Sequence, residues 1–123
     1  MQPKKQFSLS ERFKSFQYAW NGMVKVFVNE HNMWIHLFAA LAVVVAGFYF
    51  KVNNTEWMMI CIAIAMVIAA EMFNSSIEKL VDMVSPEQNE KAGLIKDIAA
   101  GAVLVCAIFA VIIGLIIFIP KIF

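Results

Sequence analysis

"AAEMFNSSIEKLVD", residues 69–82, begins inside an apolar run and ends among charged residues. On a helix that turns about 100° per residue, Asn74, Ser75, Glu78 and Asp82 all fall within about 60° of Glu71. These five residues form one face, which we call the polar stripe. The other faces of the segment are apolar. The pattern therefore predicts a single helix that crosses a membrane and continues beyond it with one hydrated face.

The composition is typical of an integral membrane protein. Of the 123 residues, 62% are hydrophobic and 15% are charged, whereas a soluble domain has about 25% charged residues. Three apolar runs, residues 33–50, 57–73 and 98–119, are each long enough to cross the hydrocarbon core as a helix. The short segment between the first two runs predicts an antiparallel hairpin. We expect an all-α membrane protein with one domain over residues 1–123, and the net charge of +1 gives no argument for a nucleic-acid partner.

The segment before the first run predicts an amphipathic surface helix over residues 8–30. Ser8 and Glu11 have the spacing of a capping box. Large apolar side chains then recur at steps of three and four, at Phe13, Phe16, Trp20, Met23 and Phe27. Such a helix with basic residues on another face suits the membrane interface; the alternative for most of it is a surface anchor without a chemical role. Ser85 followed by Pro86 predicts a further helix start before the third run.

The placement of lysine and arginine predicts the orientation. Eight of the ten basic residues lie before the first run or between the second and third runs, and only Lys51 and Lys121 lie on the other side. By the positive-inside rule, the N-terminus and the loop over residues 74–97 are expected in the cytoplasm. The N-terminal sequence has no cleavable-signal pattern. Cys61 and Cys106 show no metal-ligand spacing and are expected to be packing thiols.

The acids of the polar stripe need a positive partner. Glu71, Glu78 and Asp82 repel one another on one helix face unless a cation from another helix or a bound metal lies between them. Mg²⁺ takes one or two carboxylates and fills its shell with substrate phosphates, which points to a phosphate-bearing substrate. The alternative is an interfacial stripe with a snorkelling glutamate. A lysine at the mouth of the third run could hold a phosphate or only anchor the helix; its face carries Gly93, Lys96 and Asp97.

These residues carry a resemblance to a known family. The string E-x-x-N-S-x-I-E-x-x-V-D at residues 71–82 resembles the signature of the prokaryotic diacylglycerol kinases, small membrane kinases with three spans. The strings A-G-x-x-K-D-x-A-A-G-A-V at residues 92–103 and F-K-S-F-x-x-A-x-x-G at residues 13–22 are similar as well, and the likeness covers about residues 12–120. The segment E-H-N-M-W-I-H at residues 30–36 and the ending IIGLIIFIPK look more like the undecaprenol kinase branch of Gram-positive bacteria.

The resemblance implies a kinase that transfers the γ-phosphoryl group of ATP to a membrane lipid alcohol at the cytoplasmic face of a bacterial plasma membrane. It implies undecaprenol as the acceptor, with diacylglycerol as the alternative, Mg²⁺ as cofactor, and a homotrimer with composite active sites between protomers. Glu71 matches the general base, Glu30 and Glu78 match metal-binding carboxylates, and Asn74 supports the site. The positions implied around the nucleotide and its phosphates are Tyr18, Asp82, Gly93, Lys96 and Asp97.

Two positions depart from the family pattern. Arg12 lies one position later than the arginine of the family, which puts a lipid-binding role for Arg12 in doubt. His36 stands where enterobacterial members carry an acid, and an interfacial hydrogen-bonding role is favoured over a substrate contact. Two other classes stay as alternatives: a small multidrug-type transporter, which is expected to have four spans with its glutamate in the first, and a non-catalytic membrane adaptor, which gives no reason for the acids and Lys96 to converge.

Overall fold

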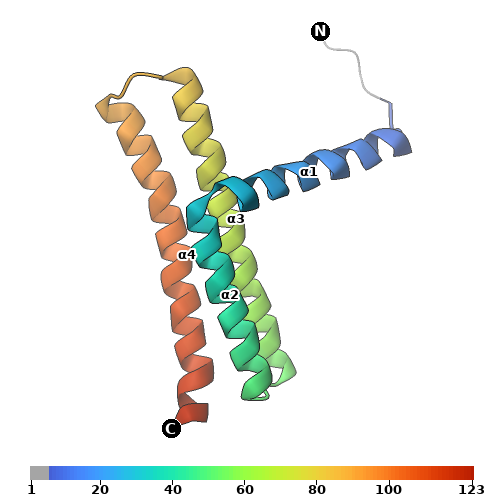
Figure 1. Ribbon diagram of the computed structural model, residues 1–123, viewed down its shortest axis with the longest axis vertical. Coiled ribbons are helices and arrows are strands. Elements are labelled where there is room, and N and C mark those ends of the chain that lie inside the picture. The colour runs from blue at the N-terminus through green and yellow to red at the C-terminus, as the bar shows by residue number, and fades with distance from the viewer. Residues whose placement is uncertain (1–5) are drawn as a thin grey trace.

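The computed structural model describes residues 6–123 as four helices (Figure 1). They are α1 (Leu9–Asn29), α2 (His31–Tyr49), α3 (Asn54–Val84) and α4 (Glu90–Ile122). Helices α2, α3 and α4 run alongside one another, and α1 extends sideways from them. The described residues contain no strand. The predicted all-α fold is confirmed, and α2, α3 and α4 are long and apolar enough to cross a membrane.

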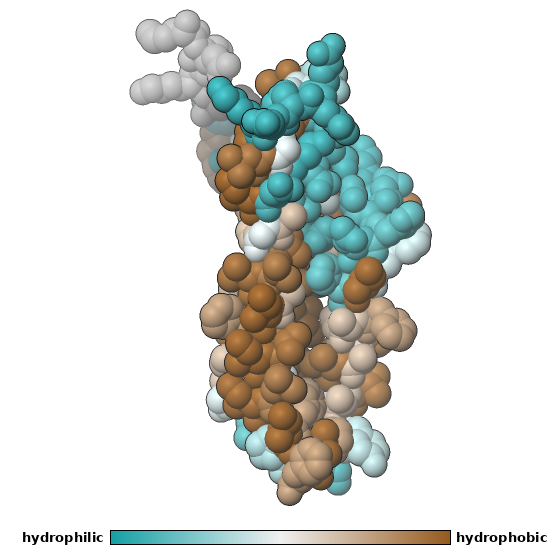
Figure 2. Space-filling model, turned by 90° about the vertical axis from the view of Figure 1, so that its left-hand side faces the viewer, coloured by the Kyte–Doolittle hydropathy of each residue, from teal (hydrophilic) through white to brown (hydrophobic). Residues whose placement is uncertain are grey.

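The three long helices expose most of their apolar side chains. In Figure 2 apolar residues cover the lower part of the molecule, and polar residues gather mainly at its upper end. Only 11% of the most apolar window of α2, and of α4, is buried, against 33% for α3. Helix α3 is therefore the central helix. The outer faces of α2 and α4 present residues such as Phe38, Leu104 and Phe109 outward, as expected for a surface covered by lipid.

A capping box starts α3 directly after the hairpin turn. The Asn53 side chain accepts a hydrogen bond from the Glu56 backbone N–H at 2.8 Å, and the Glu56 carboxylate accepts one from the Asn53 N–H at 3.0 Å. Val52 of the turn is buried against Ile60 and Ile117. The cap fixes where α3 begins, and the buried valine ties the turn to α4. The predicted antiparallel hairpin between the first two apolar runs is confirmed.

Two close contacts hold the hairpin end of the bundle together. Gly47 lets α2 approach α3, because a Cβ at this position would lie 2.6 Å from Cη2 of Trp57. Lys121 Nζ lies 2.8 Å from Oε2 of Glu56, which joins the end of α4 to the start of α3. The Lys121 ammonium, through its hydrogen bond to the Glu56 carboxylate, holds the pKa of that carboxyl below its ordinary value.

Helix α1 leaves the bundle and buries none of its residues. It begins at Leu9, close to the predicted start, but the predicted capping box is wrong. The Ser8 side chain makes no capping hydrogen bond, because its hydroxyl lies 2.9 Å from that of Ser10 instead. The apolar face of α1 is largely exposed, which fits a helix whose partner is the membrane interface rather than the protein.

The corner between α1 and α2 lies at Glu30, which ends one helix and precedes the other. Its backbone is extended, with φ −99° and ψ 113°. The Trp34 indole N–H donates a hydrogen bond to the Phe27 carbonyl at 2.6 Å and so fastens the two helices across the corner. The chain direction changes at a single residue, and the Glu30 side chain is left at the junction where α3 passes.

Helix α3 continues to Val84, about three turns beyond the apolar run 57–73. This confirms the prediction that the helix continues well beyond the apolar run. The predicted helix start at Ser85 and Pro86 is wrong, because Ser85 ends α3. Helix α4 begins only at Glu90, where the side chain of Asn89 accepts a hydrogen bond from the Ala92 N–H at 2.9 Å.

Three sequence-based expectations have a simple status in this structure. Cys61 and Cys106 are free thiols. Arg12, on α1, places its guanidinium 5.5 Å from the centre of the ring of Phe7, which precedes the helix. Lys4 and Lys5, two of the eight basic residues on the predicted cytoplasmic side, lie outside the described residues.

Candidate active site

The first half of the polar stripe is buried. Glu71, Asn74 and Ser75 are 3%, 5% and 2% exposed, although the bundle around them is small and largely apolar. Burying polar groups is costly unless they find partners. A polar stripe that served only to contact water at the membrane interface would be exposed. The interfacial interpretation of Glu71 is therefore disfavoured, and these three residues form the centre of the candidate site.

Glu71 faces a histidine from the neighbouring helix. Nε2 of His36, on α2, lies 3.4 Å from Oε2 of Glu71. The His36 side chain is 20% exposed, so the pair sits just below the surface of the bundle. Sequence reasoning treated His36 as an interfacial residue and did not include it in the site. No local pattern links two residues on different helices, so only the packing of α2 against α3 reveals this contact.

Asn74 and Ser75 each bury an oxygen that has no hydrogen-bond partner among the described residues. These atoms are Oδ1 of Asn74 and Oγ of Ser75. The other polar atom of Asn74, the amide nitrogen Nδ2, donates a hydrogen bond to Oε1 of Glu78 at 3.4 Å. Buried polar atoms in native proteins nearly always find a partner in the protein or in ordered water, so these two oxygens mark a candidate binding position. Ser75 was part of the predicted stripe but not of the predicted site; its position one turn after Glu71 is the signal that could have included it.

Two lysine–carboxylate ion pairs line the outer part of the site. Lys79 Nζ lies 2.9 Å from Oε1 of Glu30, and Lys96 Nζ lies 2.5 Å from Oδ1 of Asp82. The first joins α3 to the corner between α1 and α2, and the second joins α3 to α4. The positive partner expected for the stripe is therefore found, within residues 6–123, for one of its three acids: Lys96, from the neighbouring helix α4, pairs with Asp82.

The remaining predicted positions lie further from this centre within one chain. Gly93 and Asp97 are exposed on the first turns of α4, within one turn of Lys96. Tyr18 is 70% exposed and lies on α1, about 18 Å along the helix from Glu30. The single chain thus groups Glu71, Asn74 and Glu78 on one face of α3, pairs Glu30 with Lys79, and pairs Lys96 with Asp82 further along the same helix. It does not bring Tyr18 to the same place.

The donor set at this end of the bundle fits a hard cation only in part. Residues 6–123 hold no cluster of three or more side chains of the histidine, cysteine, aspartate or glutamate type that could bind a metal. Mg²⁺ needs only one or two protein carboxylates when substrate phosphates complete its shell. The Glu78 carboxylate accepts a hydrogen bond from Nδ2 of Asn74, whose Oδ1 has no partner in the described part of the chain, so these two residues carry oxygen atoms of the required type. Glu30 supplies a further carboxylate, currently paired with Lys79.

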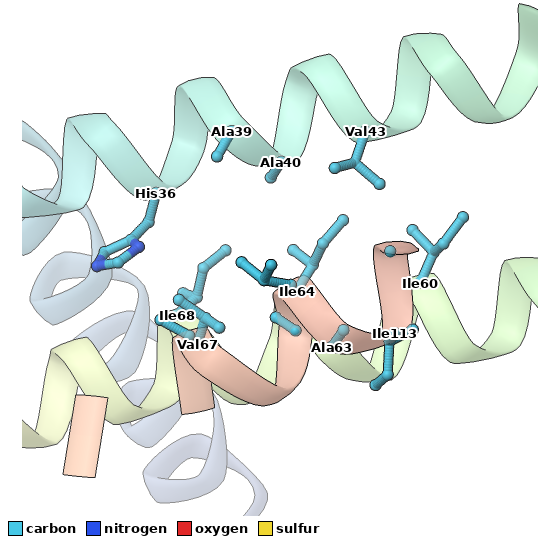
Figure 3. A pocket seen from close by; sticks show the side chains of 14 residues that line it. His36, Ala39, Ala40, Val43, Ile60, Ala63, Ile64, Val67, Ile68 and Ile113 are labelled. Carbon is cyan, nitrogen blue, oxygen red and sulfur yellow. The ribbon is translucent and has the colours of Figure 1, made fainter. Parts of the chain in front are cut away.

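An apolar cavity begins at the same place. It has a volume of about 280 Å³, is lined by α2, α3 and α4, and is open on one side. Of its fourteen lining residues, all within the described part of the chain, His36 is the only polar one. Figure 3 shows the His36 ring at one end of the cavity, with Ala39, Ala40 and Val43 following along α2. The cavity therefore leads from the membrane-facing bundle towards the Glu71 carboxylate.

The fold and the site define an all-helical membrane protein with an acidic centre where its apolar bundle meets its polar end. The family model of prokaryotic diacylglycerol kinase matches residues 17–118. The chain therefore belongs to the prokaryotic diacylglycerol kinase family, and by that membership it is a lipid kinase.

Individual relatives support this assignment. The chain is 40% identical over 113 residues to a protein of Bacillus subtilis named undecaprenol kinase, and the alignment covers 92% of each chain. It is 37% identical over 101 residues to a diacylglycerol kinase of Synechocystis, covering 81% of this chain and 58% of that one. It is 31% identical over 99 residues to a diacylglycerol kinase of Escherichia coli, covering 80% and 81%.

Proposed function

We propose that this chain phosphorylates a membrane lipid alcohol with ATP and that the acceptor is undecaprenol. The buried Glu71 carboxylate at the end of an apolar cavity carries the proposal, because a lipid hydroxyl has to meet its base where hydrocarbon gives way to water. The relative named undecaprenol kinase aligns with 92% of this chain, which favours the polyprenol. Diacylglycerol, which would give phosphatidic acid, is the second candidate, since two of the relatives carry that name.

In the proposed reaction, a carboxylate oxygen of Glu71 accepts the proton of the lipid hydroxyl. The hydroxyl oxygen forms a bond to the γ-phosphorus of ATP, the bond from that phosphorus to the β,γ-bridging oxygen breaks, and ADP leaves. A general base must lie within hydrogen-bond reach of the proton it takes. Burial of Glu71 keeps bulk water away from the carboxylate, so the lipid hydroxyl is the donor that it meets.

The nucleotide binds at the outer part of the same site in this proposal. Glu30 and Glu78 would hold Mg²⁺, with Asn74 supporting Glu78, and the ion would neutralise charge on the β- and γ-phosphates. Lys96 adds positive charge for the phosphates. The other positions proposed around the nucleotide are Tyr18, Asp82, Gly93 and Asp97.

We further propose that residues 1–123 form a single kinase domain. This domain works as a homotrimer, and each active site is completed by a neighbouring protomer. Two observations support this: Tyr18 lies far from the site of its own chain, and two buried oxygens lack partners within the described chain. The polar end of the bundle is proposed to face the cytoplasm of a bacterial cell, where ATP is available. The charge asymmetry of the sequence supports that orientation.

Family membership argues against the two other classes. A small multidrug-type transporter would need a fourth span, whereas three helices of the described chain qualify. A non-catalytic adaptor gives no reason for a buried carboxylate beside two buried oxygens without partners. Both alternatives predict no consumption of ATP that depends on a lipid alcohol.

The test is a phosphorylation assay in detergent with labelled ATP, Mg²⁺ and either undecaprenol or diacylglycerol. We expect label in undecaprenyl phosphate, and we expect Glu71→Gln to lower the rate by on the order of 10²- to 10⁴-fold. Glu87→Gln is the control, because it removes an exposed carboxylate that makes no ion pair within residues 6–123. Label mainly in phosphatidic acid would keep the mechanism and change the acceptor. No labelling of either lipid would overturn the proposal.

A further inference from the structure

The Glu71 carboxylate makes one polar side-chain contact within the described part of the chain. Within residues 6–123, His36 is the only side chain that makes an ion pair or hydrogen bond with it, at 3.4 Å from Nε2 to Oε2. A carboxylate is free to rotate about its terminal torsion, because that torsion has broad minima. A buried base with a single contact therefore depends on that contact for the direction in which its oxygens point.

His36 also stands between the carboxylate and the apolar cavity. It is the only polar residue among those that line the cavity, and its ring lies at one end of it (Figure 3). Any hydrocarbon chain that reached Glu71 through this cavity would pass the imidazole. The histidine thus meets both the base and the route to it, whereas the residues next to it on α2, such as Ala39 and Ala40, contribute only apolar surface.

We propose that His36 is a positioning residue for Glu71: it donates a hydrogen bond from Nε2–H to one carboxylate oxygen and leaves the other directed at the acceptor hydroxyl. This inference rests on the proposed function. In this arrangement His36 orients and Glu71 takes the proton, as in a catalytic triad, where a fixed hydrogen bond orients the group that takes the proton. In the structure Nε2 of His36 and Oε2 of Glu71 are 3.4 Å apart without forming that hydrogen bond, and catalytic contacts of this kind shorten and align when substrate binds.

The test compares three substitutions in the phosphorylation assay, with the concentration of lipid alcohol varied at saturating ATP and Mg²⁺. His36→Leu keeps bulk but removes the donor, and we expect kcat to fall on the order of 10- to 100-fold, because a misplaced catalytic group loses about that much. His36→Gln places a donor at a similar reach, and we expect it to recover most of the activity. KM for the alcohol should change little in either variant.

The chain offers a matched control in its only other histidine. His31 lies on the same helix, is exposed, and packs against Trp34 with tilted rings at 4.7 Å between ring centres; it makes no ion pair with Glu71. His31→Leu should retain kcat. Circular dichroism and gel filtration of each variant establish that it is folded, so that a fall in kcat is assigned to the site.

Three outcomes would overturn the inference. His36→Leu with the same kcat as His31→Leu would mean that Glu71 needs no orienting contact. A change confined to KM for the alcohol would make His36 a substrate contact instead. Failure of His36→Gln to recover activity in folded protein would mean that the donor is not what matters. Wild-type protein that phosphorylates neither lipid would instead overturn the proposed function, so the two failures are distinguishable.

Discussion

Lys79 Nζ lies 2.9 Å from Oε1 of Glu30 and so joins α3, at the residue after Glu78, to the corner between α1 and α2. The two residues are far apart in sequence, and the contact exists because Glu30 is the single residue at which the chain turns from α1 into α2. The pair occupies one oxygen of a carboxylate that we propose as a Mg²⁺ ligand. Lysine and metal therefore compete for Glu30, which leads to the first prediction.

Lys79→Gln should lower the Mg²⁺ concentration needed for half-maximal activity by about two- to fivefold. An ammonium about 3 Å from a carboxylate opposes cation binding there, but 67% exposure of the Lys79 side chain limits the effect to about 1 kcal/mol or less. Lys91→Gln is the matched control, since residues 6–123 provide no ion-pair partner for Lys91. A higher Mg²⁺ requirement in Lys79→Gln would contradict competition and place Lys79 on the nucleotide.

Ser75→Ala should leave the ligand-free protein at least as stable as wild type. Its hydroxyl is buried without a partner among the described residues, and removing such a group relieves a cost of roughly 1–3 kcal/mol. The stabilisation that a Mg²⁺ complex of a non-hydrolysable ATP analogue gives should shrink in the variant. Thermal unfolding in detergent, with and without the analogue, measures both. A lower ligand-free melting temperature with unchanged stabilisation by the analogue would show a purely structural role.

Gly47→Ala should destabilise the bundle by about 1–3 kcal/mol, the usual cost of overpacking. The new Cβ would meet the Trp57 ring at 2.6 Å, and Phe48 packs against the same ring at 4.8 Å between centres, so the ring cannot simply move away. The free energy of unfolding, measured in mixed micelles with increasing denaturing detergent, gives the size of the loss. Gly22→Ala, where no atom lies within 4 Å of the new Cβ, should be neutral or stabilising.

The ion pair between Glu56 and Lys121 should give a stability that depends on pH. Glu56 precedes the apolar run 57–73, and its carboxyl pKa lies below the ordinary 4.5 because of its hydrogen bond to Lys121. A lowered folded-state pKa means that the contribution is fully present above pH 4.5 and is lost as pH falls through the lower value. Wild type should therefore exceed Glu56→Gln in melting temperature at neutral pH, and the difference should disappear in acid. A difference that grows in acid would contradict this.

The sequence predicted those features that depend on periodicity along one helix. The three apolar runs lie within α2, α3 and α4, except that the first run ends one residue past α2. The polar stripe of Glu71, Asn74 and Glu78 also follows from helical spacing alone, since residues three and four apart share a face. These features require no knowledge of what packs against the helix.

The helix caps were predicted less well, because a cap depends on which of several nearby polar side chains reaches the backbone. Ser8 was expected to cap α1, but its hydroxyl pairs with Ser10. Asn53 and Glu56 lie three positions apart, as Ser8 and Glu11 do, and they form the capping box. The same spacing thus produces a cap in one place and not in the other, and the sequence around each pair does not decide between them.

The contacts between helices could not be read from the sequence. His36 and Glu71 lie on different helices, as do Lys79 and Glu30, and no local pattern joins either pair. Their geometry depends on how far α2 rotates about its axis when it packs on α3. The sequence therefore predicted which carboxylates share one face of α3, but not the side chains from other parts of the chain that contact carboxylates of the candidate site.

The length of α3 has a consequence for the lipid in which the protein works. Glu71 lies 17 residues after Asn54, where α3 begins, and this distance is about 26 Å along a rigid helix. A hydrocarbon core is about 30 Å thick. Since no loop lies between Asn54 and Glu71, the continuous helix fixes the distance of the carboxylate from the membrane surface at the start of α3. In a bilayer whose hydrocarbon core is much thinner or thicker than this distance, the lipid hydroxyl would lie at a different depth from Glu71. Activity should therefore peak in membranes of matching thickness.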